Sequence, residues 1–360
     1  MPMQSNKNFY DGQNIYVGID VHARQWHVFA SPVGGMGMKA VTMPPQASAL
    51  KAYLDRTFPG GTFKSAYESG FCGFVPHRQL LQAGIDNIVF NAADLKKSQK
   101  EHLRKTDAVD CKAIWENLMK GDIRSIYIPT DQEEQNRELI RGRESVVKDL
   151  RRNKQRIRML LHRLNIDMPE KFSTRTIYWS CQFIEWLKIL ADSLEGGHSM
   201  KLRCLLEQID ILKTQKKSYD REILKVMTEQ YADIGELLRT IPGIGNLLSA
   251  KLCLELMNFS RFADARHLAG YIGLVPDCKI SDKKEAILGT SIRRNSILRT
   301  ALIEASWIAI ARDPALGKVF SKCRRDGKHA NLAIISVARK LVNRIFYVWR
   351  TKKKYELSKD

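Results

Sequence analysis

The chain has 360 residues, with 59 Lys and Arg against 39 Asp and Glu, which gives a formal net charge of +20. This length allows two or three domains with hydrophobic cores, and the ordinary apolar content of 44% excludes a disordered chain. The charge favours nucleic acid as a partner over a merely solvated basic surface, because Lys and Arg that meet phosphates release condensed counterions.

The cysteines and the apolar runs bear on where the protein works. The seven cysteines are scattered, and no CxxC pair or Cys/His cluster has the spacing of a zinc site. We expect them to be reduced thiols. The N-terminus lacks the apolar core of a signal peptide, and no run of about eighteen apolar residues could cross a bilayer. The sequence therefore predicts a cytoplasmic protein without a membrane partner.

Strand and helix patterns alternate over residues 1–130. Strands are predicted at 15–20, 26–30, 38–43, 63–68 and 87–92, and helices at 44–58, 73–84 and 107–121. Gly34, Gly35 and Gly37 mark the turn between the second and third strands. Three strands followed by alternating helices and strands predict an α/β domain with a mixed sheet, in the order of the ribonuclease H fold of RuvC-like enzymes.

From residue 131 the pattern becomes helical, and apolar side chains recur every 3.5 residues in two segments. The first seam is Ile140, Val147, Lys154 and Leu161 with Arg143, Leu150, Ile157 and Leu164, and the second is Leu202, Ile209, Lys216 and Ile223 with Leu205, Leu212, Tyr219 and Val226. Two such seams predict an antiparallel hairpin or a coiled-coil dimer arm over 131–236. A further apolar helix is expected at 176–191 and a loop at 195–198.

The first arm segment is strongly basic outside its seam. Arg151 and Arg152 there, with Lys154 of the seam, are candidate nucleic-acid contacts, and a solvated helix face is the alternative. The remaining block, 237–360, is predicted to be mainly helical, with basic helices at 295–311 and 332–350. Its IPGIG segment (241–245) resembles a helix-hairpin-helix element, whose glycines let a backbone turn approach a phosphate. A plain tight connection between two helices explains the same residues.

Four carboxylates stand out by their positions. Asp20 ends the first predicted strand and Glu68 ends the fourth, and these two strands are neighbours in a ribonuclease H sheet. Asp107 and Asp110 are three residues apart, which places both on one face of a helix near its N-terminus. Such a set repels itself unless a cation is present, and two Mg²⁺ ions about 4 Å apart would allow phosphodiester displacement. Taken singly, each acid could instead be a helix charge or a cap.

Three sequence blocks resemble the signature motifs of a known family. They are GIDVHARQWHVFA, YESGFCGFVPHRQLLQAGI and RKTDAVDCKAIWENLMKGDI. They are similar to the motifs of the DEDD insertion-sequence transposases, the relatives of the Piv invertase (insertion-sequence family one-ten). The resemblance continues through the basic arm and resumes from IPGIG to IEASW. It covers most of the chain in the expected order and is weakest over 170–200.

The resemblance implies the catalytic residues. The family's four metal-binding carboxylates map onto Asp20, Glu68, Asp107 and Asp110. Its serine follows a GLVP motif, present here at 273–276, and falls at Ser281, with Asp282 in place of the usual glycine. The later block GTSIRRN makes Ser291 a competing nucleophile. It also carries two candidate nucleic-acid contacts, Arg293 and Arg294, the second where glycine is usual.

The resemblance also implies a mechanism and partners. A serine activated by metal or a base would attack DNA and form a covalent phosphoserine link. The serine and the carboxylates would come from different domains. In a dimer or tetramer, the two domains that meet would belong to different subunits. A structured bridge RNA would select target and donor DNA by base pairing, which leaves backbone and shape contacts to the protein.

We therefore predict a metal-dependent DNA transposase or recombinase. The main alternative is a RuvC-like junction resolvase or nuclease that hydrolyses DNA without a serine. This alternative gives no role to residues 237–350. A nucleic-acid-binding scaffold with an inactive site would show the same charge and arm. An actin-like sugar kinase would explain VGIDVHA as a phosphate loop, but the second Gly-rich loop and the adenosine motif of that fold are not visible.

Overall fold

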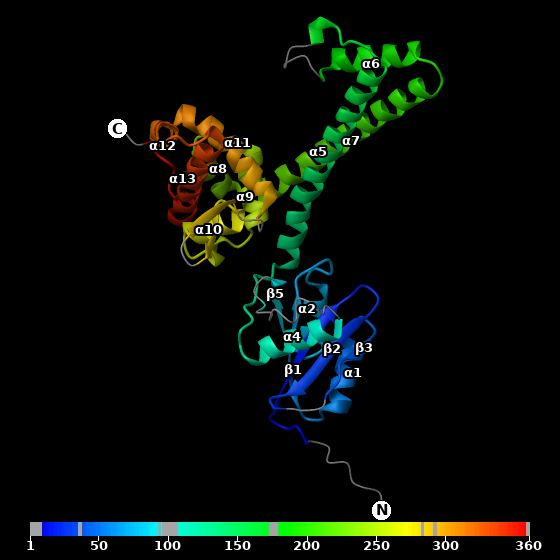
Figure 1. The fold of residues 1–360 in the computed structure, drawn as a ribbon, viewed down its shortest axis with the longest axis vertical. Coiled ribbons are helices and arrows are strands. Elements are labelled where there is room, and N and C mark those ends of the chain that lie inside the picture. Colours follow the sequence, from blue (N-terminus) through cyan, green and yellow to red (C-terminus); the bar gives the residue numbers. More distant parts are fainter. Residues whose placement is uncertain are drawn as a thin grey trace, which may run out of the picture. The chain divides into compact units, whose positions relative to one another are not determined.

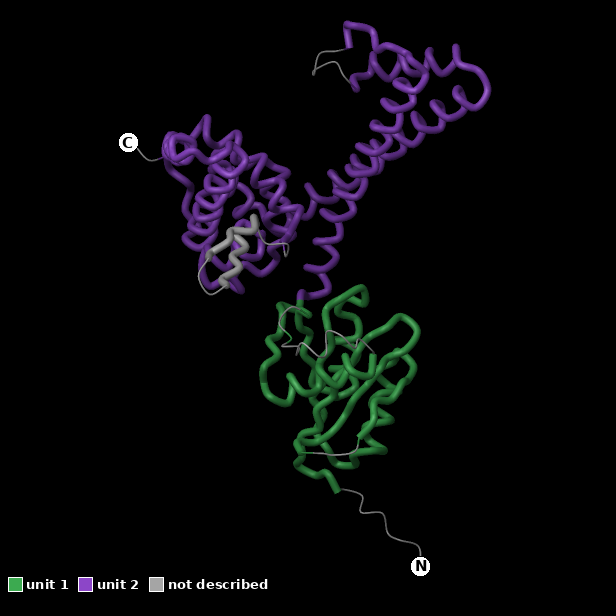
Figure 2. The backbone as a smooth tube through the Cα atoms, in the orientation of Figure 1, with its two compact units in different colours: residues 1–128 green, residues 129–360 purple. Residues whose placement is uncertain are grey.

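The computed structural model describes residues 9–34, 38–92, 95, 107–172, 179–281, 284–290 and 294–357. The chain divides into two compact units, Met1–Ile128 and Pro129–Asp360, which Figure 2 colours separately. The division falls beside the predicted domain end at 130, and a further boundary at 236 stays a prediction. Among the described helices, none combines the length and the apolar character that crossing a bilayer requires.

The first unit is built on a mixed five-stranded sheet. Its strands are β1 (Asn14–Val21), β2 (Trp26–Pro32), β3 (Val41–Met43), β4 (Thr62–Glu68) and β5 (Asp86–Phe90), in the order β3-β2-β1-β4-β5. The first three strands pair antiparallel, whereas β1, β4 and β5 are parallel. The predicted mixed sheet is therefore confirmed, although β3 is shorter than predicted. Gly34 turns with a φ of +77°, and Gly35 and Gly37 lie outside the described residues.

Helices cover both faces of this sheet (Figure 1). Successive strand residues point to opposite faces. On one face Ile15, Val17 and Ile19 pack with α1 (Ala47–Thr57) and α2 (Val75–Gln82) in one apolar cluster. On the other face α4 (Asp107–Met119) packs across β1, β2 and β4, with Trp115 against Phe29. The sheet is thus buried on both faces, and α4 carries two of the predicted acids over it.

The second unit begins with a helical arm. Its helices are α5 (Asp131–Arg163), α6 (Cys181–Ser193) and α7 (Gly196–Gln230), and α5 starts with a capping box between Thr130 and Glu133. α5 and α7 are antiparallel: Asn136 bonds Gln230 at 2.8 Å, and Arg143 bonds Asp220 at 2.6 Å. All the predicted seam residues are buried or half-buried. Of the two predicted forms, the chain adopts the antiparallel hairpin.

The predicted loop at 195–198 is wrong. α7 begins at Gly196, because this glycine takes a φ of +53° and reverses the chain directly after α6.

The rest of the second unit is mainly helical, as predicted. Its helices are α8 (Ala232–Arg239), α9 (Asn246–Leu256), α10 (Ala265–Ile272), α11 (Ser296–Arg312), α12 (Pro314–Arg325) and α13 (Ala330–Thr351). They share one apolar core. The short 3₁₀ helices are Glu170–Phe172 and Phe259–Arg261. The exception to the helical pattern is a hairpin of β6 (Pro276–Ser281) and β7 (Lys284–Thr290), inserted between α10 and α11.

The two glycines of the IPGIG segment differ in their surroundings. Gly243 has a φ of +89°, and a Cβ there would lie 2.4 Å from the Ala305 carbonyl oxygen of α11. This glycine is therefore needed for close packing against α11. Gly245, the residue before α9, has nothing within 4 Å of its Cβ position. The packing thus explains Gly243, and the helix-hairpin-helix interpretation of this turn stays a prediction.

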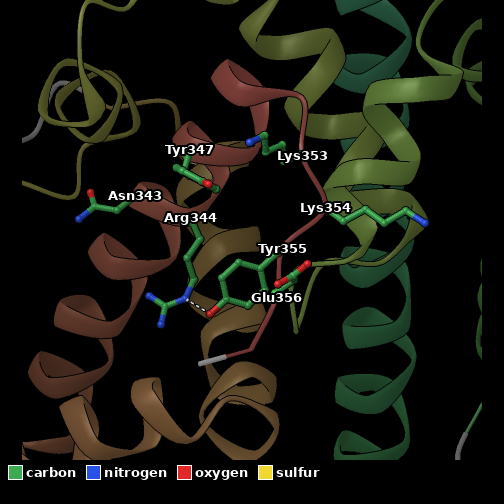
Figure 3. A pocket seen from close by; sticks show the side chains of 7 residues that line it. All are labelled: Asn343, Arg344, Tyr347, Lys353, Lys354, Tyr355 and Glu356. Carbon is green, nitrogen blue, oxygen red and sulfur yellow. Dashed lines mark hydrogen bonds between the residues drawn. The ribbon is translucent and has the colours of Figure 1, made fainter. Parts of the chain in front are cut away.

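Asp313 is a buried carboxylate at the start of α12, only 1% exposed. It accepts hydrogen bonds from the Leu316 N–H at 3.2 Å, Arg344 Nε at 3.1 Å and the Tyr355 hydroxyl at 2.8 Å. Figure 3 shows Arg344 and Tyr355 meeting on one side of a basic pocket. The carboxylate thus fastens α13 and the C-terminal tail to α12.

We expect Asp313→Ala to lower the free energy of unfolding by about 3–5 kcal/mol, because it leaves Arg344 without its buried partner and removes a helix cap. Urea unfolding followed by circular dichroism would measure this loss. Asp313→Asn keeps a cap oxygen and is expected to cost less, and the exposed Asp326→Ala is the control. An equal effect of Asp313→Ala and Asp326→Ala would contradict the buried ion pair.

Candidate active site

Strand pairing places Asp20 and Glu68 side by side. Ile19 of β1 is in register with Tyr67 of β4, so Asp20 and Glu68 are the next pair on adjacent parallel strands. Adjacent strands are about 4.8 Å apart, and residues in register point to the same face. For both acids this is the face that α4 covers. The predicted convergence of the two strand ends is therefore present in the backbone, with Asp20 half-buried and Glu68 exposed.

Gly18 lets α4 approach the sheet closely enough to deliver its acids. A Cβ at Gly18 would lie 2.0 Å from the Cys111 carbonyl oxygen and 2.5 Å from the Trp115 amide nitrogen. Backbone of α4 therefore occupies the space that any larger side chain would need. Asp107 is the first residue of α4 and Asp110 follows on the same side of the helix. The contact at Gly18 thus sets the height of both acids above β1.

Two histidines join acids from the sheet and the helix. His22 Nε2 lies 3.1 Å from Asp20 Oδ2 and 3.8 Å from Asp107 Oδ1. His27 Nε2 lies 3.1 Å from Asp107 Oδ2, and its Nδ1 lies 3.1 Å from the Thr42 hydroxyl. Asp20 and Asp107 therefore meet around one imidazole. Their side chains are 25% and 50% exposed, so the site is open to solvent at the end of the sheet.

Cys111 is a buried thiol of α4 near Asp20 and Asp110. Burial of its thiol, with the negative charges of Asp20 and Asp110 nearby, raises the pKa of Cys111 to about 12. Cys111 is fully buried, and its sulfur bonds the Ala108 carbonyl oxygen at 3.3 Å. The cysteine itself stays a neutral thiol at physiological pH.

Ser281 lies in the other unit of the chain. It is the last residue of β6, and its backbone pairs with that of Lys284 beside the turn of the hairpin. Asp282, Ser291 and Arg293 lie outside the described residues, and for 276–290 only the backbone is described. The structure therefore places Ser281 at the tip of a hairpin.

Both ends of this hairpin are anchored to helices. On its N-terminal side, the carbonyl oxygens of Gly273 and Leu274 accept hydrogen bonds from Arg299 and Arg339. On its C-terminal side, Asn295 Nδ2 donates to Glu255 Oε2 at 2.8 Å. Glu255 is fully buried in α9 and also accepts from Arg141 Nε of the arm at 3.1 Å. The root of the hairpin is thus tied to α9, α11, α13 and, through Glu255, to α5.

Two family models match separate stretches of this chain. Residues 17–166 match a model described as a transposase, of the DEDD type of IS110 elements. Residues 235–321 match the transposase IS116/IS110/IS902 family. This chain carries both domains of an IS110/IS116-family transposase. The two matches fall on the carboxylate site and on the helical region that holds the hairpin.

Two relatives with transposase names and one pilin gene-inverting protein are similar to this chain over different shares of its length. The transposase for insertion sequence element IS1533 of Leptospira borgpetersenii is 22% identical, over 94% of this chain and 96% of that protein. The transposase for IS1111A of Coxiella burnetii is 26% identical, over 65% and 63%. The pilin gene-inverting protein of Moraxella bovis is 34% identical over a shorter stretch, 33% of this chain and 38% of that protein.

The predicted nucleic-acid contacts of this transposase differ in their surroundings. Arg151 and Arg152 are exposed on α5, and Arg152 pairs with Asp149 at 3.0 Å. Lys154 is half-buried with its ammonium 5.0 Å from the centre of the Trp179 ring, and burial lowers its pKa. Arg294 is exposed just before α11. The two arginines of α5 are thus more accessible to a phosphate than Lys154 is.

His22 and His27 are the site residues that sequence reasoning missed. Both belong to the VHARQWH segment, part of the first signature block, in which the sequence pattern assigns no role to either histidine. A signal was present: His22 is two residues after Asp20, and His27 alternates with the buried Trp26 and Val28. The register that pairs Asp20 with His27 puts the second histidine on the acid face. That register depends on the turn length, which the pattern alone left open.

Proposed function

We propose that this transposase cuts and rejoins DNA at a site where Asp20, Glu68, Asp107 and Asp110 hold two Mg²⁺ ions. The observation that carries the proposal is the meeting of Asp20 and Asp107, from a strand and a helix far apart in sequence, around the same His22 nitrogen. Acids brought together in this way repel one another, and a bound cation removes that repulsion. A structural role for each acid separately would not require them to converge.

The donor set fits a divalent metal ion. The four carboxylates supply hard oxygen ligands, and Asp20 and Asp107 remain partly exposed, so water and DNA can reach them. Such an ion would stabilise the charge that develops on the oxygens around phosphorus during phosphodiester displacement. The protein contributes the rigid placement: strand register holds Asp20 beside Glu68, and the contact at Gly18 holds α4 above them.

We further propose that Ser281 is the nucleophile. Its oxygen attacks phosphorus and loses its proton, the bond from phosphorus to a sugar oxygen breaks, and that oxygen leaves as a DNA hydroxyl. The phosphoserine bond conserves the phosphodiester energy until a DNA hydroxyl displaces the serine and rejoins the strand. The position of Ser281 at the tip of an anchored hairpin supports this role, since such a tip can reach into a DNA-bound site.

Ser281→Ala is expected to abolish the covalent protein–DNA adduct and strand cleavage together, because its hydroxyl is the proposed acceptor of the phosphoryl group. Denaturing gels of labelled DNA carrying the ends of the insertion sequence would measure both. Ser218→Ala, exposed on the arm, is the control. If Ser291→Ala alone stops the reaction, Ser291 is the nucleophile. Cleavage that survives both changes would instead support the hydrolytic resolvase.

We propose DNA and a guide RNA as partners of a homo-oligomer, a dimer or tetramer. The net charge of +20 and the exposed basic row on α5, which includes Arg151, Arg152 and Arg158, support a long phosphate-binding surface. The open pocket of about 660 Å³ at the C-terminal tail adds Lys353 and Lys354 (Figure 3). The location of the acids and Ser281 in separate units supports a catalytic site completed by a second copy.

A further inference from the structure

Three side chains at the end of the sheet bring potential metal ligands together. One ring nitrogen each from His22 and His27 and a carboxylate oxygen of Asp107 all lie within 4.8 Å of one another. Asp107 Oδ2 is 3.1 Å from His27 Nε2, and Asp107 Oδ1 is 3.8 Å from His22 Nε2. Metal–nitrogen and metal–oxygen bonds are about 2.0–2.2 Å long, so two ligands of one ion lie roughly 3 Å apart. The separations of 3.1 Å and 3.8 Å between Asp107 and the two histidines are thus close to the spacing of two ligands on one ion.

The hydroxyl of Thr42 orients the ring of His27. Its Nδ1 atom lies 3.1 Å from the Thr42 hydroxyl on β3, which holds the ring with Nε2 turned toward Asp107. A histidine that binds a metal commonly donates its other ring N–H to such a partner, and this bond selects the tautomer whose lone pair faces the ion. The amide of Gln25 also lies 3.0 Å from this Nε2. Gln25 is exposed, so its side chain can turn into solvent when the nitrogen takes a ligand.

His22 is placed by the turn between β1 and β2. It follows Asp20 by two residues, and its ring meets that of His27 edge to face with 5.6 Å between centroids. Its Nε2 also contacts Asp20 Oδ2 at 3.1 Å, which adds a fourth potential ligand on the same side. The side chain of His22 is 47% exposed, whereas that of His27 is 14% exposed. The site is therefore accessible to an ion from solvent.

The ligand types select the metal. Mg²⁺ prefers an octahedron of oxygen ligands and keeps several waters. Imidazole nitrogen suits zinc and its first-row neighbours, whose affinity for such ligands exceeds that of the hard cations. Two imidazoles with one or two carboxylates form a set typical of Zn²⁺ or Co²⁺ coordination. Four carboxylates without the histidines would not favour Zn²⁺ or Co²⁺ over Mg²⁺ in this way.

We propose that His22, His27 and Asp107 bind a divalent transition metal ion of the zinc type, with Asp20 as an additional ligand. The site shares Asp107 and Asp20 with the proposed Mg²⁺-binding tetrad, yet it is argued from the nitrogen ligands and is measured without DNA. The transition-metal proposal can therefore be wrong while the proposed function is right. The proposed function can likewise be wrong while the transition-metal site is right.

The direct test is Co²⁺ binding to the metal-free, full-length protein without an affinity tag. We expect intense visible absorption from one Co²⁺ of low coordination number, loss of this signal on adding Zn²⁺, and no loss with a thousandfold excess of Mg²⁺. His22→Ala and His27→Ala should each weaken binding at least about 100-fold, whereas His198→Ala, an exposed histidine on α7, should not change it. Glu68→Gln and Asp110→Asn should retain the signal.

Thr42→Val leaves every ligand in place, and removes only the hydroxyl behind His27. We expect it to weaken Co²⁺ binding about 10–100-fold. In the unmodified protein, Zn²⁺ should protect His22 and His27, but not His198, from diethylpyrocarbonate, with mass spectrometry locating the modified residues. The proposal is overturned if Co²⁺ shows only the weak spectrum of the hydrated ion, if the histidine variants bind as tightly as the wild type, or if Zn²⁺ gives no protection. These measurements need no cleavage activity.

Discussion

Gly18→Ala is expected to reduce DNA strand cleavage by at least about 100-fold. The added methyl group would sit 2.0 Å from the Cys111 carbonyl oxygen, and a helix backbone cannot move aside as a flexible side chain can. α4 must therefore shift outward, and it carries Asp107 and Asp110 with it. Overpacking of this kind costs typically about 1–3 kcal/mol of stability, so the unit should still fold while its site is pulled apart.

The displacement of α4 can be measured apart from cleavage. Cys111 is fully buried and its pKa is raised to about 12, so its thiol should resist maleimide in the wild type. In Gly18→Ala we expect its labelling rate to rise, while the exposed Cys181 and Cys204 react equally in both proteins. Gly270→Ala is the matched control, because nothing lies within 4 Å of its Cβ position. Full cleavage activity in Gly18→Ala would refute the close contact between β1 and α4.

Asp20→Asn and Glu68→Gln are each expected to lower cleavage by at least about 100-fold while leaving the protein folded. The amide keeps the shape of the side chain but removes the negative charge that a divalent cation requires. Asp20 is the second-to-last residue of β1 and Glu68 is the last residue of β4, and neither belongs to the apolar core. Circular dichroism should therefore show little change, and the loss should appear in the cleavage assay across a Mg²⁺ titration.

Asp55→Asn provides the comparison for these variants. Asp55 is an exposed acid on α1, paired with Lys51 at 2.6 Å, and α1 covers the opposite face of the sheet. Asp55→Asn removes one negative charge from the same unit as Asp20→Asn does, but it lies outside the candidate site. Cleavage should therefore be unaffected. Wild-type cleavage in Asp20→Asn would exclude the tetrad as the catalytic centre. Equal losses in Asp20→Asn and Asp55→Asn would point to general charge rather than to a site.

The anchoring of the serine hairpin offers a physical reason for one motif residue. Asn295 ends the GTSIRRN block, and its carbonyl oxygen Oδ1 caps α11 by accepting from the Leu298 N–H at 3.0 Å. Its amide donates at the same time to the buried Glu255, which Arg141 of the arm also contacts. A single side chain therefore starts α11, closes the hairpin region and links it to α5. Aspartate would keep the cap but face Glu255 with a like charge.

Local patterning determined most of the first unit. The alternation of apolar residues predicted the strands and helices of the mixed sheet, and the strand ends predicted Asp20 and Glu68 as partners. This works because strand faces and helix faces repeat with fixed periods, which the order of residues records directly. The seams of α5 and α7 were predicted for the same reason, including the buried Arg143, which ion-pairs with Asp220.

Only the tertiary structure decided which faces meet and how closely. Gly18 looks like an ordinary strand residue in sequence, yet the approach of α4 makes it the position that sets the acid geometry. His27 joined the site through its register with Asp20, and Gly196 began a helix where a loop was predicted. Register, turn length and interhelical contact depend on residues distant in sequence, so periodicity cannot specify them. The sequence therefore predicted the four acids as one site, whereas the contacts of the two histidines with Asp20 and Asp107 appear only in the fold.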